Sequence, residues 1–157
     1  MSGHCLLLRK DLRGPLEPPR WSPGVRQVVW TPARLEPVHQ LLTQAYRNGS
    51  GRIPDLDSWG EQLATDAEFD PTLCFIAEDA GAVVGVALGW VSAYIKDLVV
   101  APQWQREGLG RALLLQIFAA YKQRGEPWVD LRVLENNWRA RWLYQSVGMC
   151  VVLREPY

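Results

Sequence analysis

The sequence lacks both an excess of charge of one sign and any long apolar run. Its 17 Lys and Arg residues balance 17 Asp and Glu residues over 157 positions. Without a basic excess, nothing attracts the chain to nucleic acid or to an anionic membrane, and we expect neither as a partner. No apolar stretch approaches the roughly 20 residues that a membrane helix needs, and we find no signal peptide. The sequence therefore predicts a cytoplasmic protein.

Cysteine and histidine are also scarce. Cys5, Cys74 and Cys150 are odd in number and widely spaced, without the paired short spacing of a zinc site. Cys74 and Cys150 lie in apolar, strand-like runs, which favours buried free thiols in a reducing compartment. His4 and His39 belong to no metal-ligand spacing. We therefore expect no metal.

The overall composition is that of one globular domain. Hydrophobic residues make up 48% and charged residues 22%, which excludes disorder for most of the chain. Residues 10–24 hold Pro15, Pro18, Pro19 and Pro23 among charges, and proline favours extended, exposed chain. We therefore predict an N-terminal extended arm over residues 1–24 and a single domain over residues 25–157.

Apolar periodicity predicts the element order β-α-α-β-β-β-α-β-α-β. This order indicates a layered α+β fold with helices packed on a mixed sheet. The predicted strands cover residues 25–30, 73–78, 83–91, 94–100, 128–134 and 149–154. The predicted helices cover residues 33–46, a short stretch capped by Asp57 or Ser58, residues 108–124 and a last helix that follows Asn137.

One segment with the order strand, turn, helix carries the clearest chemical signal. The strand over residues 94–100 runs out at Pro102, and a turn with Gly108 and Gly110 then leads into a helix. This arrangement aims backbone N–H groups at one point, where the helix dipole favours an anion and glycine permits close approach. The segment therefore predicts a phosphate or pyrophosphate site. The alternative is that both glycines serve turn geometry alone.

Two common phosphate-binding motifs are absent from this segment. A nucleoside-triphosphate P-loop would end in Gly-Lys-Ser/Thr, whereas Gly110 is followed by Arg111 and Ala112. A dinucleotide fingerprint would place a third glycine at position 113, which is Leu113. Neither ligand class is therefore indicated.

Two motifs together resemble one known family. A pyrophosphate-binding motif, [Gln/Arg]-x-x-Gly-x-[Gly/Ala] after a strand ending in Val-x-Pro, is matched by Gln105, Gly108, Gly110 and Val100-Ala101-Pro102. A second motif, Asn-x-x-Ala-x-x-Leu-Tyr-x-x-x-Gly-[Phe/Met], is matched by Asn137, Ala140, Leu143, Tyr144, Gly148 and Met149. Both belong to the GNAT superfamily of N-acetyltransferases, which the chain resembles over roughly residues 70–150.

The resemblance implies a GNAT fold and acetyl transfer from acetyl-CoA to an amine. Acetyl-CoA would lie where the parallel strands 94–100 and 128–134 splay apart. A backbone N–H within Leu98, Val99 and Val100 would polarise the thioester carbonyl. The remaining cofactor contacts would come from Gln105, Arg106, Glu107, Gly108, Leu109, Gly110, Arg111, Asn137 and Tyr144. Asn137 either contacts the CoA arm or only caps its helix.

The resemblance also implies a catalytic acid, Tyr144, which would protonate the departing thiolate. A neutral phenol can donate at physiological pH, although a tyrosine on an apolar helix face can also be a core residue. For the base, Asp97 and Glu78 are candidates. Asp97 lies among apolar residues that would raise its proton affinity, or it is only salt-bridged. The base position varies within the family and is sometimes taken by water.

The acceptor is the least determined part of the sequence prediction. The acidic run at residues 53–70 holds no Lys or Arg, so it either steers a cationic amine or is a solvated helix face. Trp59 and Trp90 are candidates for an acceptor wall, and Trp138 and Trp142 for packing. We expect a small or cationic amine, or a peptide amine, as acceptor. A non-catalytic acyl-CoA-binding module remains the alternative, and a homodimer is possible for the family.

Overall fold

A computed structural model describes residues 3–48 and 52–157. Along the chain these residues form β1 (His4–Asp11), β2 (Val25–Val28), η1 (Pro32–Arg34), α1 (Leu35–Ala45), η2 (Tyr46–Asn48), α2 (Leu56–Thr65), β3 (Phe69–Asp79), β4 (Ala82–Trp90), β5 (Tyr94–Val100), η3 (Pro102–Trp104), α3 (Leu109–Gln123), β6 (Trp128–Leu134), α4 (Trp138–Ser146) and β7 (Cys150–Pro156). The strands β5 and β6 have the bounds that the sequence predicts.

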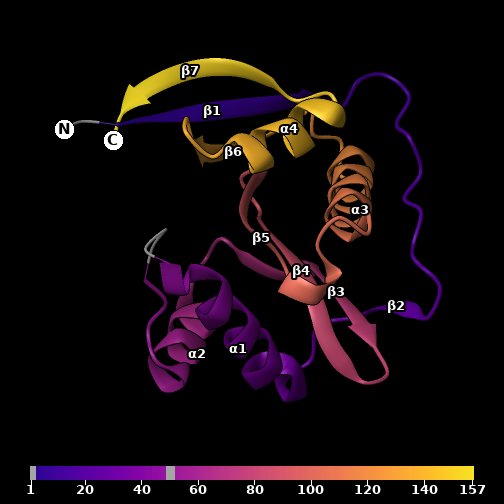
Figure 1. The fold of residues 1–157 in the computed structure, drawn as a ribbon, viewed down its shortest axis with the longest axis vertical. Coiled ribbons are helices and arrows are strands. Elements are labelled where there is room, and N and C mark those ends of the chain that lie inside the picture. The colour runs from indigo at the N-terminus through magenta and orange to yellow at the C-terminus, as the bar shows by residue number, and fades with distance from the viewer. Residues whose placement is uncertain (1–2, 49–51) are drawn as a thin grey trace.

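The strands form one mixed sheet in the order β2-β3-β4-β5-β6-β1-β7 (Figure 1). The pairs are antiparallel except that of β5 and β6, which is parallel. The predicted mixed sheet with helices packed on it is therefore confirmed.

The strands β5 and β6 separate soon after they begin. Their register contains one pair, Tyr94 with Asp130, near the start of each strand. Toward Val100 and Leu134 the edge of β5 that faces β6 is left without a strand partner, whereas its other edge stays paired with β4. This divergence is the splay that the resemblance implies.

The predicted extended arm over residues 1–24 is wrong for residues 4–11. These residues form β1, which lies between β6 and β7 and pairs antiparallel with both. Leu6 and Leu8 alternate into the core, and Leu12 follows them there. Three adjacent leucines conceal this alternation in the sequence. Residues 12–24 form neither helix nor strand, and residues 1–2 lie outside the described part of the chain.

The first two helices differ from the predicted ones in their starts. Thr31 lies at the N-cap of η1 without a capping side-chain bond, and α1 begins only at Leu35. Asp55, rather than Asp57 or Ser58, caps α2, because its carboxylate accepts from the N–H of Ser58. The predicted break after α1 at residues 49–51 lies outside the described residues.

Helix α3 packs closely on β4 because two glycines face it. A Cβ at Gly85 would lie 2.9 Å from Leu113, and one at Gly89 would overlap the hydroxyl oxygen of Tyr121. Side chains alternate along a strand, so Leu88 faces the opposite side of the sheet, toward α1. The sheet is thus covered on one side by α3 and on the other by α1.

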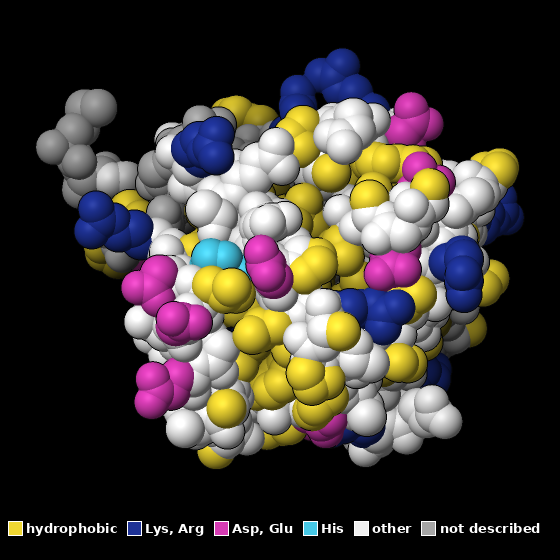
Figure 2. Space-filling view, turned by 90° about the horizontal axis from the view of Figure 1, so that it is seen from below, with side chains coloured by type: hydrophobic (Ala, Val, Ile, Leu, Met, Phe, Trp, Pro, Cys, Tyr) yellow, Lys and Arg dark blue, Asp and Glu magenta, His cyan; other side chains and the backbone are white. Residues whose placement is uncertain are grey.

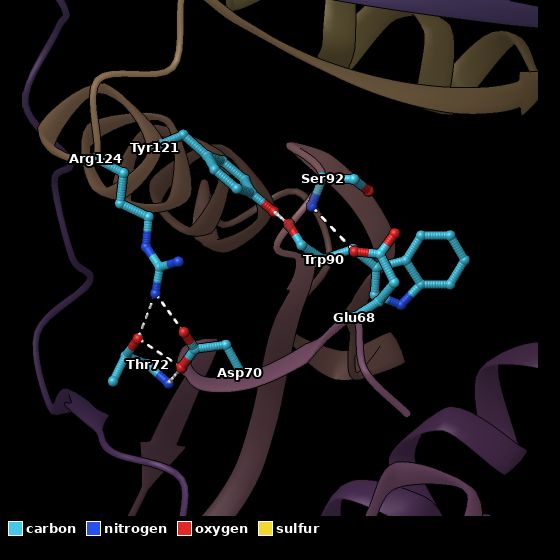
Figure 3. A network of polar contacts seen from close by, with 7 residues as sticks. All are labelled: Glu68, Asp70, Thr72, Trp90, Ser92, Tyr121 and Arg124. Carbon is cyan, nitrogen blue, oxygen red and sulfur yellow. Dashed lines mark hydrogen bonds and ion pairs between the residues drawn. The ribbon is translucent and has the colours of Figure 1, made fainter. Parts of the chain in front are cut away.

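A polar network fixes the C-terminal end of α3 (Figure 3). Tyr121 donates from its hydroxyl to the backbone oxygen of Trp90 at 2.6 Å. Arg124 donates to Asp70 at 2.5 Å and to Thr72 at 2.8 Å, both on β3. Glu68 accepts from the N–H of Ser92 in the turn before β5. These bonds tie α3 to the strands at the end where β5 begins.

The cysteines differ in their exposure. Cys74 is buried, and burial raises the pKa of its thiol to about 12. Cys150 is exposed, which corrects the prediction that it is buried, because the edge strand β7 is covered on neither face. Among the described helices, none is long and apolar enough to cross a membrane.

Gly89→Ala is expected to destabilise the protein by about 1–3 kcal/mol, because the added methyl overpacks the contact with Tyr121 and with Ile117, 2.9 Å away. The urea midpoint measures this loss. Gly14→Ala is the matched control, since a Cβ there meets nothing within 4 Å. Equal midpoints for the two variants would contradict the close packing of α3.

Candidate functional site

Two adjoining cavities open where β5 and β6 separate. The first, with a volume of about 740 Å³, lies between residues 105–111 and α4, and we call it the cradle cavity. The second, of about 400 Å³, lies between β5 and β6, and we call it the strand cavity. Their walls share Leu98, Val100, Gln105, Asn137, Ala140 and Tyr144. The two cavities therefore form one continuous groove.

The turn before α3 has the backbone of an anion-binding nest. Arg106 has φ 67° and Gly108 has φ 81°, both in the left-handed region. The first helical bond of α3 runs from Ala112 N to Gly108 O, so the N–H groups of Leu109, Gly110 and Arg111 precede the helical pattern. A Cβ at Gly108 would meet nothing within 4 Å. The turn thus offers free donors, and open space above Gly108 admits a phosphate group.

Two arginines of residues 105–111 line the cradle cavity, Arg106 in the turn and Arg111 at the start of α3. Arg111 donates to Glu17 at 2.8 Å and to the backbone and side chain of Ser146 at 3.2 Å. Ser22 also donates to the backbone oxygen of Glu107. The segment that precedes β2 therefore runs against the turn, and Glu17 occupies part of the guanidinium of Arg111.

The strand β5 offers two backbone donors to the groove. Ala101 donates its N–H to Val84 O on β4, and alternate residues of a strand point to the same side. The N–H of Val99 therefore also points to β4, while those of Leu98 and Val100 point to the gap left by β6. The predicted donor range of Leu98, Val99 and Val100 thus narrows to Leu98 and Val100.

Tyr144 lies on α4 at the junction of the two cavities. Burial raises the pKa of its phenol to about 12, so the hydroxyl stays protonated at neutral pH. Asn137 accepts at 3.2 Å from the N–H of Ala140 and so caps α4, although it also lines both cavities. Asn137 therefore fits both of its predicted roles.

The two candidate bases lie in different surroundings. Asp97 is 7% exposed, and burial raises the pKa of its carboxyl group. Its Oδ1 accepts a hydrogen bond of 2.7 Å from the hydroxyl of Tyr46. Glu78 is instead held by Arg34 at 3.0 Å, near the edge strand β2. Neither carboxylate lines either cavity.

Of the twelve predicted cofactor residues, ten line the groove, and Leu109 and Glu107 do not. Leu109 is 1% exposed, so its side chain belongs to the core and only its N–H is available. Glu107 lines neither cavity, and Val99 lines only the strand cavity. The predicted residues that line the cradle cavity are Leu98, Val100, Gln105, Arg106, Gly108, Gly110, Arg111, Asn137 and Tyr144.

Several wall residues were not predicted from the sequence. Tyr46 lines the strand cavity, and Trp104, Arg139 and Trp142 line the cradle cavity. Trp142 was predicted to pack but is 72% exposed, because its face of α4 meets no other element. No local signal gives this exposure, because two tryptophans four residues apart on a helix also fit a packed apolar stripe.

The other tryptophans correct the predicted acceptor wall. Trp59 is buried in the core beside Trp30, and Trp90 stacks on Tyr94 at 5.3 Å. Neither lines either cavity. Trp138 was also predicted to pack, yet it is 70% exposed beneath the guanidinium of Arg141.

The acidic run does not reach the groove. Acidic side chains gather at one edge of the lower face, on the side of α2 (Figure 2). Asp55 caps α2, Asp66 accepts from Glu68 N, and Asp70 pairs with Arg124. No residue of the run lines either cavity, whereas Lys96 and Arg132 line the strand cavity. Among the described residues, no cluster of three His, Cys, Asp or Glu side chains is arranged to hold a metal.

Comparison with known proteins gives one family. The acetyltransferase (GNAT) domain family matches residues 70–148. A mycothiol acetyltransferase of Thermobispora bispora is 33% identical over 156 residues, which covers 90% of this chain and 52% of the relative. A [ribosomal protein bS18]-alanine N-acetyltransferase of Escherichia coli is 31% identical over 93 residues, which covers 57% of this chain and 63% of the relative. The chain thus spans about half the length of the first relative.

A solved structure agrees with the sequence comparison. A GCN5-related N-acetyltransferase from Sphaerobacter thermophilus superposes with a TM-score of 0.85 and 25% identity, covering 99% of this chain and 50% of that one. The predicted fold and the predicted family resemblance are confirmed.

Asp97→Asn is expected to gain stability relative to the wild type as pH rises. The folded state raises the pKa of Asp97, so the folded protein binds its proton more tightly than the unfolded chain does. The wild type therefore loses stability as pH rises from the unfolded value through the folded one, whereas asparagine does not titrate. Urea unfolding from about pH 4 to about pH 8 measures the difference.

Asp70→Asn is the control, for which we expect the opposite change of stability with pH. Arg124 and Thr72 lower the pKa of Asp70 to about 2, so its contribution to stability is present above the unfolded pKa and lost as pH falls through the folded one. Between about pH 2 and about pH 4, where this carboxyl group titrates, the variant should therefore lose stability relative to the wild type as pH rises. The same slope for both variants would contradict the burial of Asp97.

Proposed function

Because the chain belongs to the GNAT acetyltransferase family, we propose that it transfers the acetyl group of acetyl-CoA to a primary amine. The amine would attack directly, with no covalent enzyme intermediate. The observation that carries the proposal is the continuity of the groove, in which the free N–H groups of the turn adjoin the strand donors and Tyr144. One extended ligand with a pyrophosphate and a thioester end fits this arrangement.

The N–H groups of Leu109, Gly110 and Arg111 would hold the pyrophosphate, and the guanidinium of Arg106 would add a charge-assisted bond. Acetyl-CoA supplies an activated thioester when bound. The N–H groups of Leu98 and Val100 would polarise the thioester carbonyl. Tyr144, protonated because of its raised pKa, would donate to the departing thiolate sulfur. Asp97 would receive the proton that the acceptor ammonium must lose.

The acceptor that we propose is the amine of a small molecule or peptide that is not polycationic. Support comes from the charges of the strand cavity, whose wall holds Lys96 and Arg132 but no carboxylate. The names of the relatives point the same way, since one is an alanine N-acetyltransferase of a ribosomal protein. Both observations favour a single reactive amine over a polyamine.

Gly108→Glu is expected to abolish binding of acetyl-CoA, because the new carboxylate fills the open space above the turn and repels phosphate. Titration calorimetry measures the affinity, and Gly108→Gln, of the same size without the charge, separates the two effects. In the wild type, acetyl-CoA and CoA should raise the melting temperature, whereas ATP should not. A wild type that neither CoA species stabilises would contradict the proposal.

Tyr144→Phe is expected to lower turnover by about 10²-fold while leaving the calorimetric affinity for acetyl-CoA unchanged, because only proton donation is lost. Release of free CoA thiol from acetyl-CoA in the presence of an amine measures turnover. Full turnover in the variant, with chemistry rate-limiting, would make Tyr144 structural. Acetyl-CoA binding with no turnover on any amine by the wild type would instead favour a non-catalytic acyl-CoA-binding module.

A further inference from the structure

Asp97 is separated from the groove by one side chain. Asp97 lines neither cavity, whereas Tyr46 lines the strand cavity together with Tyr144. Tyr46 directly follows the last residue of α1, a helix that packs on β5. Its hydroxyl donates to Oδ1 of Asp97 at 2.7 Å. A proton that leaves a molecule in the strand cavity can therefore reach the buried carboxylate through one intervening oxygen.

We propose that Tyr46 is the proton relay between the acceptor amine and Asp97. This inference rests on the proposed acetyltransferase function. An N–H bond of the acceptor ammonium breaks, and its proton binds the Tyr46 oxygen while the Tyr46 hydroxyl proton moves to Oδ1 of Asp97. The electron pair of the broken bond stays on nitrogen, which becomes the nucleophile. Tyr46 ends neutral and Asp97 ends as the carboxylic acid.

The direction of the existing hydrogen bond prepares this transfer. The carboxylate of Asp97 can only accept, so the hydroxyl hydrogen of Tyr46 points to it and this bond leaves the lone pairs of the hydroxyl oxygen unused. Burial and the charge of Asp97 raise the pKa of Tyr46, which disfavours a tyrosinate. The two proton movements are therefore coupled, and Tyr46 passes a proton without holding a charge.

Three other titratable groups face this pair in the described part of the chain. Lys96 Nζ lies 4.0 Å from Oδ2 of Asp97, and its positive charge lowers the carboxyl pKa against the larger effect of burial. Cys74 faces Asp97 from β3 and stays a neutral thiol, because burial raises its pKa to about 12. Tyr144 faces Tyr46 from α4. Among these three groups and Asp97, only Asp97 is an anion that can take the proton.

The test is the pH dependence of kcat/KM for the amine in the wild type, Tyr46→Phe, Asp97→Asn and the double variant. The acceptors are glycinamide, an alanine-initiated pentapeptide and spermidine, at saturating acetyl-CoA. In Tyr46→Phe, kcat/KM should fall about 10²-fold near neutral pH and then rise only with the unprotonated fraction of the free amine. The KM for acetyl-CoA should not change. Tyr157→Phe, an exposed tyrosine outside both cavities, should match the wild type.

The activities of the two single variants also predict the activity of the double variant. If Tyr46 and Asp97 act in one chain, Asp97→Asn should show the same pH profile, and the double variant should be no slower than either single variant. A purely structural role of Tyr46 would lower activity equally at every pH and would shift the melting temperature.

Two results would overturn the relay while leaving the proposed function intact. In the first, Tyr46→Phe keeps the wild-type decrease in kcat/KM at acidic pH, whereas Asp97→Asn loses it. This result would mean that the proton reaches Asp97 through water instead of through Tyr46. In the second, both variants keep the wild-type profile, so that the base lies elsewhere. Absence of wild-type turnover with all three acceptors would instead overturn the proposed acetyl transfer, and the relay with it.

Discussion

The strands β5 and β6 meet at Tyr94 and Asp130 and then part, and this divergence produces both the strand cavity and the free backbone donors of β5. Asp130 is held at the meeting point by Arg9 of β1, which donates to both carboxylate oxygens at 2.8 and 2.9 Å. Arg9 also stacks over Trp128 at the start of β6. Beyond this clamp, the unpaired edge of β5 keeps its backbone donors available. Closing the ladder would stabilise the sheet but would remove them.

Burial of Asp97 within the sheet raises its affinity for a proton. The aspartate of β5 lies among apolar neighbours, where its ionised form is costly, and two partners, Tyr46 and Lys96, offset part of that cost. A fully solvated carboxylate at this position would be more stable and a weaker base. The same burial keeps Cys74 protonated, so the thiol next to the carboxylate does not compete for its role.

Local signals in the sequence predict the parts of the site that depend on short segments. The strands β5 and β6, the glycine turn and the cap at Asn137 all follow from spacing within a few residues. The strand β1 does not, because its apolar alternation is short and its neighbours are proline-rich. The contact of Tyr46 with Asp97 joins residues 51 positions apart, and no local pattern reports such a pair. The exposure of Trp142 likewise depends on which elements α4 meets.

The place of β1 also bears on the order in which the chain can fold during synthesis. Its two neighbours in the sheet, β6 and β7, follow all the other described strands in the sequence. Leu6 and Leu8 therefore stay exposed until β6 and β7 have been made, and their strand pairs are distant in sequence. The clamp of Arg9 on Asp130 forms at the same late stage. The contact that holds β6 beside β5 at Asp130 therefore joins segments that are made far apart in time.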